Sequence, residues 1–156
     1  MPKIKSPLTF NRKATSPNQR LPFFKKAKRG ELRGGFWAVP EMGGYGGGCE
    51  TGKDLALIYL LHLKNHAQFS GGILQRIALD MLLDDESSIS DSLQGQIVGF
   101  FCQIEEILIS TSKHINPKQT EDELLNLANK GLYGYNQATE KYAKEIENEK
   151  ETNHVS

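Results

Sequence analysis

The sequence predicts a mostly α-helical fold: a small bundle of four to five helices with a disordered basic N-terminal arm and a frayed acidic C-terminal tail. Apolar residues recur at helical spacing in several segments after residue 52. Two of these segments begin with a Thr that is followed three residues later by Asp or Glu, which is typical of a helix start. The predicted parts are an arm at 1–33, a helical domain at 34–135 and a solvated helix with a disordered tail at 136–156.

Charge divides the chain sharply. The 156 residues include 19 basic and 19 acidic side chains, so the net charge is zero. Residues 1–33 nevertheless hold ten Lys or Arg against one acid, Glu31, and the rest of the chain carries the compensating negative charge. Such asymmetry indicates an anionic partner for the arm. That partner is nucleic acid, an anionic membrane or the acidic body of the protein itself.

The arm is rich in Pro, Lys, Arg, Ser and Asn and has no periodic apolar pattern. It therefore predicts a disordered segment that contributes little to the core, and its deletion is expected to leave stability nearly unchanged. Phe23-Phe24, directly before the densest basic run, is its one local anchor. The arm supplies the candidate residues for binding nucleic acid or another polyanion: Lys25, Lys26, Lys28, Arg29 and Arg33. A tail that is merely solubilising is the simpler alternative.

Residues 36–39 form a short extended segment that Pro40 ends, and a glycine-rich loop is expected at 43–52. The first helix is predicted from 52 to 66, with Thr51 and Asp54 as its capping box. It is apolar almost all round and should be central. The second helix begins near 70–72, and its apolar residues are expected on one face: Ile73, Leu74, Ile77, Ala78, Met81 and Leu82.

The third helix is predicted from about 90 to 113. Gly95 and Gly99 within it each cost ~1 kcal/mol relative to Ala, and their spacing predicts a groove where another backbone packs closely. The fourth helix opens with a capping box at Thr120 and Glu123 and stops at Gly131. Oppositely charged pairs four residues apart then indicate a solvated last helix.

The glycine-rich segment formally matches the GxxxxGK pattern of phosphate-binding loops between Gly47 and Lys53. A nest of backbone N–H groups there, with the Lys53 ammonium, would bind a phosphate, a carboxylate or a partner's acidic side chain. This alternative site consists of Gly46, Gly47, Gly48, Thr51, Gly52 and Lys53. Against it, Asp54 stands where a nucleotide-binding loop has Ser or Thr, and the preceding strand candidate ends too early. The alternative without a ligand is a glycine loop packed against Trp37 and Tyr45.

Other patterns argue against catalysis and metal binding. His62 and His66 lie one helical turn apart, but no third ligand is evident, so solvated histidines are expected. The two cysteines have neither a disulfide pattern nor metal-ligand spacing.

A helix-turn-helix around 70–72 is disfavoured because its second helix would expose only Gln75, Arg76 and Asp80. No apolar run is long enough to span a membrane, and a cytoplasmic location is the expectation.

These patterns predict a non-enzymatic accessory or binding protein without a cofactor. Its basic arm contacts nucleic acid or another polyanion, and its helical body contacts a protein partner or a second copy of the chain. The alternative is a small anion- or nucleotide-binding domain, possibly catalytic, that uses the loop from Gly43 to Lys53.

Overall fold

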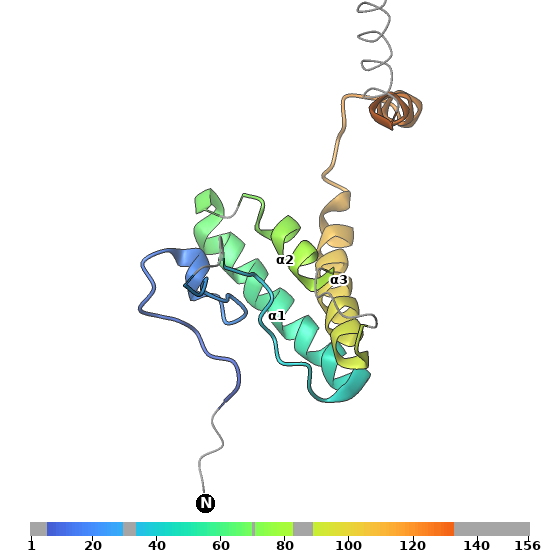
Figure 1. The fold of residues 1–156 in the computed structure, drawn as a ribbon. Helices are drawn as coiled ribbons and strands as arrows, with labels where there is room; N and C mark the ends of the chain where they lie inside the picture. The colour runs from blue at the N-terminus through green and yellow to red at the C-terminus, as the bar shows by residue number, and fades with distance from the viewer. Residues whose placement is uncertain (1–5, 30–33, 70, 83–88, 133–156) are drawn as a thin grey trace, which may run out of the picture. The chain divides into compact units, whose positions relative to one another are not determined.

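The computed structural model describes residues 6–29, 34–69, 71–82 and 89–132, and these are mostly α-helical as predicted (Figure 1). The chain divides into two units, Met1–Lys113 and His114–Ser156. The first contains α1 (Gly44–His66), α2 (Ile73–Leu82) and α3 (Asp91–Ser112), with short 3-10 helices η1 (Pro17–Arg20) and η2 (Ala67–Phe69). The second contains a helix at 121–132. The described residues include an isolated antiparallel bridge but no strand.

The expected glycine loop at 43–52 is wrong, because α1 already begins at Gly44 and includes these residues. Its N-cap is Gly43, whose φ of 85° lies in the left-handed region that glycine adopts easily. Thr51 and Asp54 therefore lie inside the helix and do not cap it. The segment expected to be a loop instead forms the first turns of α1. The predicted domain bounds stay a prediction.

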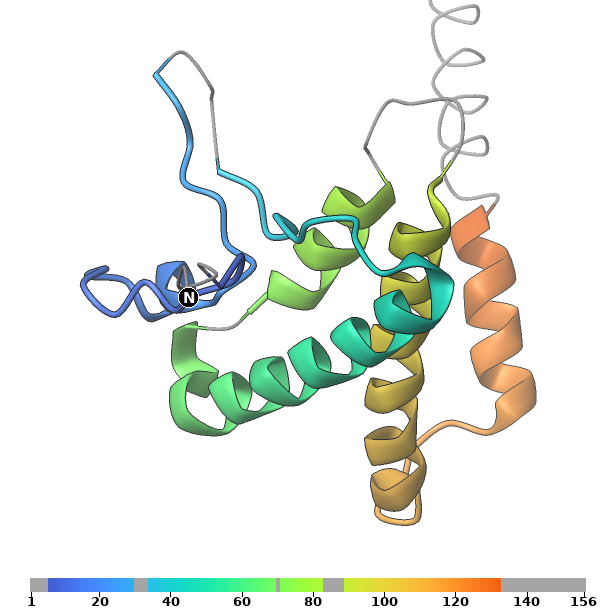
Figure 2. The ribbon, with the colours of Figure 1, turned by 90° about the horizontal axis from the view of Figure 1, so that it is seen from below.

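Two glycines of α1, Gly48 and Gly52, are tolerated in the helix because they pack against α3. A Cβ atom on Gly48 or Gly52 would come within 2.2 Å of a carbonyl oxygen of α3. On α3, a Cβ atom on Gly95 would come within 2.1 Å of the Tyr45 carbonyl oxygen, and one on Gly99 within 2.0 Å of the Cys49 carbonyl oxygen. Two pairs of glycines four residues apart thus face each other where the helices cross (Figure 2). The predicted packing groove at Gly95 and Gly99 is confirmed.

Two predicted helix starts are confirmed. The Ser90 hydroxyl caps α3 by accepting a hydrogen bond from the Leu93 N–H at 3.1 Å. At the start of the helix at 121–132, Thr120 and Glu123 form a reciprocal capping box. The Thr120 N–H donates to the Glu123 carboxylate at 2.9 Å, and the Glu123 N–H donates to the Thr120 hydroxyl at 3.3 Å.

The core of the first unit combines all three helices with the N-terminal segment. Its buried side chains are Leu21, Phe23, Phe36, Val39, Leu55, Ala56, Tyr59, Ile73, Ile77, Met81, Phe100 and Ile104. The predicted face of α2 is confirmed for Ile73, Ile77 and Met81, which are its buried residues. It is wrong for Leu74 and Leu82, which are 36% and 63% exposed. No helix in the described part of the chain has both the length and the apolar composition needed to cross a membrane.

The prediction that the arm contributes little to the core is wrong for Leu21 and Phe23, which are both buried in it. Phe23 is 0% exposed and its ring centroid lies 5.5 Å from that of Trp37, while its carbonyl accepts a hydrogen bond from the Ala38 N–H at 2.9 Å. These contacts with residues 36–39 offset the ordering entropy that sequence composition alone leaves unopposed. Residues 1–5 and 30–33 of the predicted arm, and the predicted tail at 136–156, lie outside the described residues.

Candidate nucleic-acid interface

The predicted polyanion-binding residues lie on a loop with a closed base. We define the basic loop as residues 25–35, of which 25–29 and 34–35 are described. Lys25 and Gly35 exchange two backbone hydrogen bonds, each 2.9 Å long, as an antiparallel bridge. The two described limbs leave the body side by side (Figure 2). The basic residues are therefore presented by a loop with fixed ends and not by a free tail.

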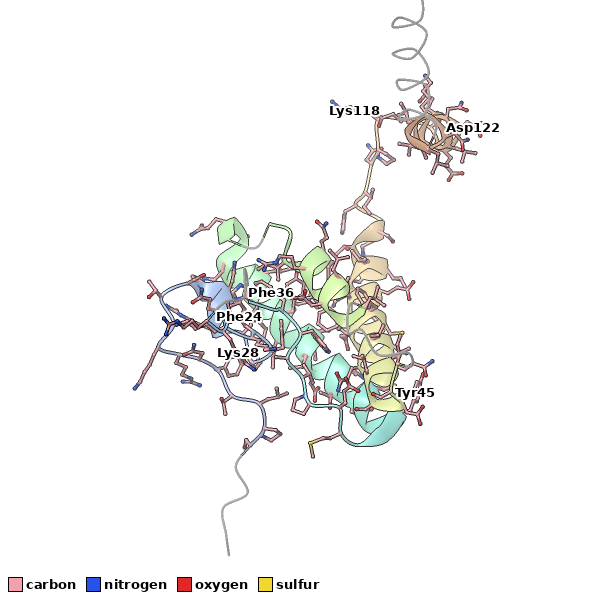
Figure 3. All side chains as sticks on the ribbon, viewed as in Figure 1. Phe24, Lys28, Phe36, Tyr45, Lys118 and Asp122 are labelled. Carbon is pink, nitrogen blue, oxygen red and sulfur yellow. The ribbon has the colours of Figure 1, made fainter. Side chains whose placement is uncertain are left out.

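Close packing at Gly34 and two aromatic rings hold the base of the basic loop. A Cβ atom on Gly34 would come within 2.3 Å of the Lys25 carbonyl oxygen, so this approach requires glycine. The rings of Phe24 and Phe36, labelled in Figure 3, meet edge to face with centroids 5.2 Å apart. Edge-to-face contact of this kind stabilises beyond the area that it buries.

Helix α2 anchors the returning limb of the basic loop. Arg76 donates from Nη2 to the Gly34 carbonyl at 3.3 Å, and its guanidinium carbon lies 4.4 Å from the Phe36 ring centroid. One turn later, the Asp80 carboxylate accepts a hydrogen bond from the Phe36 N–H. Both side chains are half-buried, so the expectation that they would be exposed on α2 is wrong. Their positioning role was missed because only the fold brings residues 34–36 to α2.

The structure brings four of the five predicted basic residues together. Lys25, Lys26, Lys28 and Arg29 are all exposed on one limb of the basic loop, and Arg33 lies outside the described residues. These four exposed side chains concentrate positive charge on one limb of the basic loop. Their binding to a polyanion stays a prediction.

The glycine-rich alternative site has a different geometry from the expected nest. The Gly47 N–H donates to the Gly43 carbonyl at 3.2 Å, and the residues after it belong to the regular helix α1. Gly48 and Gly52 are buried against α3, whereas Gly46 and Lys53 are exposed and Thr51 is half-buried. The segment is also not a loop under Trp37 and Tyr45, since Tyr45 is itself part of α1. Anion binding by these residues stays a prediction, and this geometry does not favour it.

His62 is buried, which corrects the expectation that both histidines of α1 are solvated. Its side chain is 8% exposed, and its Nε2 lies 2.9 Å from Asn18 Oδ1, which ties η1 to α1. The ring centroids of His62 and His66 are 5.0 Å apart. Within the described ranges, no group of three or more His, Cys, Asp or Glu side chains is placed to hold a metal ion.

Stability should fall when the medium is acidified, and His62 should carry part of that change. Burial lowers the pKa of His62 below its usual value, and the neighbouring His66 lowers it further. Between the lowered pKa and the unfolded value of about 6.5, the unfolded chain binds more protons than the folded chain. The contribution of His62 to the free energy of unfolding is therefore fully present above this pH range, and it declines as the pH falls through the range.

Urea unfolding at several pH values, for the wild type and His62→Gln, tests this prediction. The variant should lose less stability than the wild type between neutral and mildly acidic pH. An exposed-residue control, His114→Gln, should keep the wild-type dependence. An unchanged pH dependence in His62→Gln would contradict the prediction.

Comparisons of the chain with protein-family models, with curated proteins and with solved structures found no match.

Proposed function

We propose that this chain is a non-enzymatic binding protein whose basic loop contacts nucleic acid or another polyanion, and whose helical body contacts a protein partner or a second copy. The proposal rests mainly on four exposed basic side chains, Lys25, Lys26, Lys28 and Arg29, held on a loop with a hydrogen-bonded base. Its location is proposed to be cytoplasmic, since the free thiols of Cys49 and Cys102 suit a reducing compartment.

Two features favour binding at the basic loop: its ordered ends and the negative charge of the rest of the chain. Its ends are already ordered by the bridge between Lys25 and Gly35, so association removes less conformational freedom than it would from a disordered arm. The chain after Gly34 contains eighteen acidic and nine basic residues, so its net negative charge repels phosphate. Contact is thereby confined to the N-terminal part of the chain.

Exposed apolar side chains near the end of α3 support the protein partner. The last two turns of this helix, residues 105–112, are exposed. They include Ile107, Leu108 and Ile109, which are 41%, 56% and 67% exposed. Contiguous exposed apolar side chains favour aggregation in an isolated protein, and they mark interaction sites where a partner covers them. The described residues of the first unit leave this surface uncovered.

Fluorescence anisotropy with labelled single-stranded RNA, single-stranded DNA and duplex DNA tests the polyanion contact. The variant removes four charges: Lys25→Gln, Lys26→Gln, Lys28→Gln and Arg29→Gln. The matched control removes the same charge from other exposed positions: Lys53→Gln, Lys64→Gln, Lys113→Gln and Lys118→Gln. For duplex DNA, the slope of log affinity against log salt should become shallower by about 3 to 4 in the loop variant only.

Binding of heparin tests whether the basic loop binds a polyanion other than nucleic acid. If heparin binds and all nucleic acids fail, the polyanion proposal holds and the nucleic-acid assignment fails. Equal losses in the loop variant and the control variant would show general charge attraction without a site. Full affinity in the loop variant would overturn the assignment of the basic loop.

A further inference from the structure

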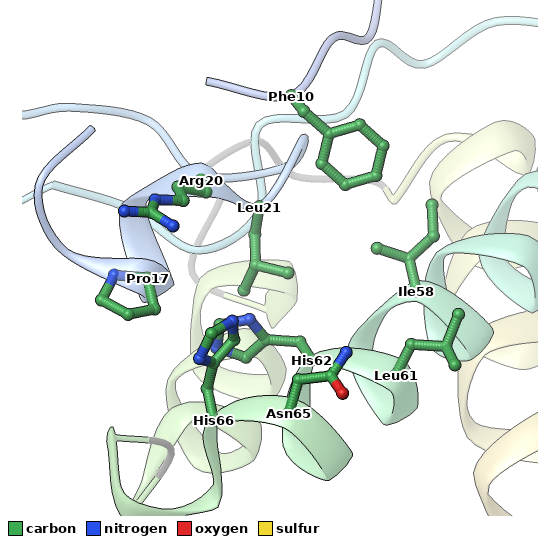
Figure 4. A pocket seen from close by; sticks show the side chains of 9 residues that line it. All are labelled: Phe10, Pro17, Arg20, Leu21, Ile58, Leu61, His62, Asn65 and His66. Carbon is green, nitrogen blue, oxygen red and sulfur yellow. The ribbon is translucent and has the colours of Figure 1, made fainter. Parts of the chain in front are cut away.

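A cavity of about 230 Å³ lies between the N-terminal segment and the second half of α1 (Figure 4). Two of its lining residues are buried: Leu21 is 3% exposed and His62 is 8% exposed. A hydrogen bond between His62 and Asn18 joins α1 to η1. The cavity is separate from the basic loop and plays no part in the polyanion contact proposed above.

The side chains around the cavity include both apolar and basic groups. Phe10, Ile58 and Leu61 lie at one end, and Arg20 and His66 lie toward the other (Figure 4). Phe10 is 48% exposed and Leu61 is 59% exposed, although both line the cavity. A ligand with an apolar part would remove this apolar surface from water, which is favourable.

Arg20 supplies a positioned cation at the polar end. Its Nε donates to the Ala14 carbonyl at 2.9 Å, which restrains the guanidinium group. Among the described residues, its two terminal nitrogens have no partner. A guanidinium group with these donors unused matches the two oxygens of a carboxylate. The imidazole of His66 and the amide of Asn65 add further hydrogen-bonding groups to the lining.

We propose that this cavity binds a small apolar carboxylate, with the carboxylate at Arg20 and the hydrocarbon part against Phe10, Ile58 and Leu61. An apolar cavity of roughly 150 Å³ admits benzene. The larger volume here has room for an aromatic ring or a branched chain together with the acid group. One guanidinium group suits a singly charged acid better than a doubly charged phosphate ester.

A chemical-shift titration of the ¹⁵N-labelled full chain tests the proposal. The probes are phenylacetate, its neutral analogue phenylacetamide, and acetate, which lacks the ring. Phenylacetate should bind saturably and shift amide signals of residues 10–21 and 58–66. Phenylacetamide and acetate should each bind at least about tenfold more weakly, because one lacks the charge and the other lacks the apolar part.

Two variants and one control separate binding from folding. Arg20→Gln should weaken phenylacetate at least about tenfold and leave phenylacetamide unchanged. Leu61→Glu changes an exposed position and should weaken phenylacetate by repulsion, which keeps the test valid if Arg20→Gln disturbs the N-terminal segment. Lys64→Gln removes an exposed cation of α1 outside the cavity lining and should bind like the wild type.

Three results would overturn the proposal. They are the absence of saturable phenylacetate binding, equal affinity for phenylacetate and phenylacetamide, and shifts located away from the cavity. Equal weakening by Lys64→Gln and Arg20→Gln would also overturn it, because the effect would then depend on net charge alone.

Discussion

Phe23→Ala should lower the free energy of unfolding by about 3–5 kcal/mol, the range for removing a buried phenylalanine. Phe23 is 0% exposed, and its ring packs on Trp37, which in turn meets Phe100 of α3 edge to face with centroids 5.3 Å apart. The substitution therefore leaves a cavity between the N-terminal segment and the helices. Urea unfolding followed by circular dichroism measures the loss.

Phe10→Ala is the matched control, because it makes the same chemical change in the same segment at a side chain that is 48% exposed. It should cost much less than Phe23→Ala. Equal small effects, below about 1 kcal/mol for both, would mean that residues 6–29 do not belong to the core. Deleting residues 1–33 should likewise be strongly destabilising, in contrast to the expectation from composition alone.

Gly99→Ala should destabilise the protein by about 3 kcal/mol, near the upper end of the range for overpacked cores. Alanine normally stabilises a helix relative to glycine by ~1 kcal/mol, so the expected sign is reversed. The reason is that the new methyl group would meet the Cys49 carbonyl oxygen at 2.0 Å. The obstacle is backbone and not a movable side chain, so the two helices must separate.

Gly46→Ala provides the comparison within α1. A Cβ atom at Gly46 meets nothing within 4 Å, and the residue is exposed. Its substitution should raise stability by up to ~1 kcal/mol through helix propensity. Thermal melting of both variants gives the two signs directly. A neutral or stabilising effect of Gly99→Ala would show that α1 and α3 do not cross at these glycines.

Helical periodicity and capping predict much of this fold. The start of α3 at Ser90 and the reciprocal capping box at Thr120 are local patterns, and both are confirmed. The buried face of α2 is confirmed for Ile73, Ile77 and Met81. Gly95 and Gly99 also show their role in the sequence, because two glycines one turn apart in an otherwise apolar helix need a packing reason.

The first turns of α1 illustrate what local patterns miss. Six glycines in residues 43–53 disfavour a helix by propensity, and contact with α3 compensates at Gly48 and Gly52. Sequence reasoning found one half of the crossing, at Gly95 and Gly99. It read the complementary half, at Gly48 and Gly52, as a loop, because no local signal pairs the two.

The basic residues of the candidate site can be predicted from the sequence, but the loop that presents them cannot. The basic run from Lys25 to Arg29 is evident in the sequence, whereas its closed base depends on contacts between distant segments. Arg76 and Asp80 hold residues 34–36 across more than forty positions of chain. A pair of opposite charges on the polar face of α2 was the available signal, and it is equally typical of a solvated helix.

Lysine footprinting by reductive methylation and mass spectrometry tests most directly whether the basic loop contacts nucleic acid. The full chain is labelled with and without a saturating oligonucleotide, at low salt. Lys25, Lys26 and Lys28 should be protected, while the exposed Lys53, Lys64 and Lys113 should react equally in both samples. Protection spread evenly over all six lysines, or confined to the second group, would contradict the proposed interface.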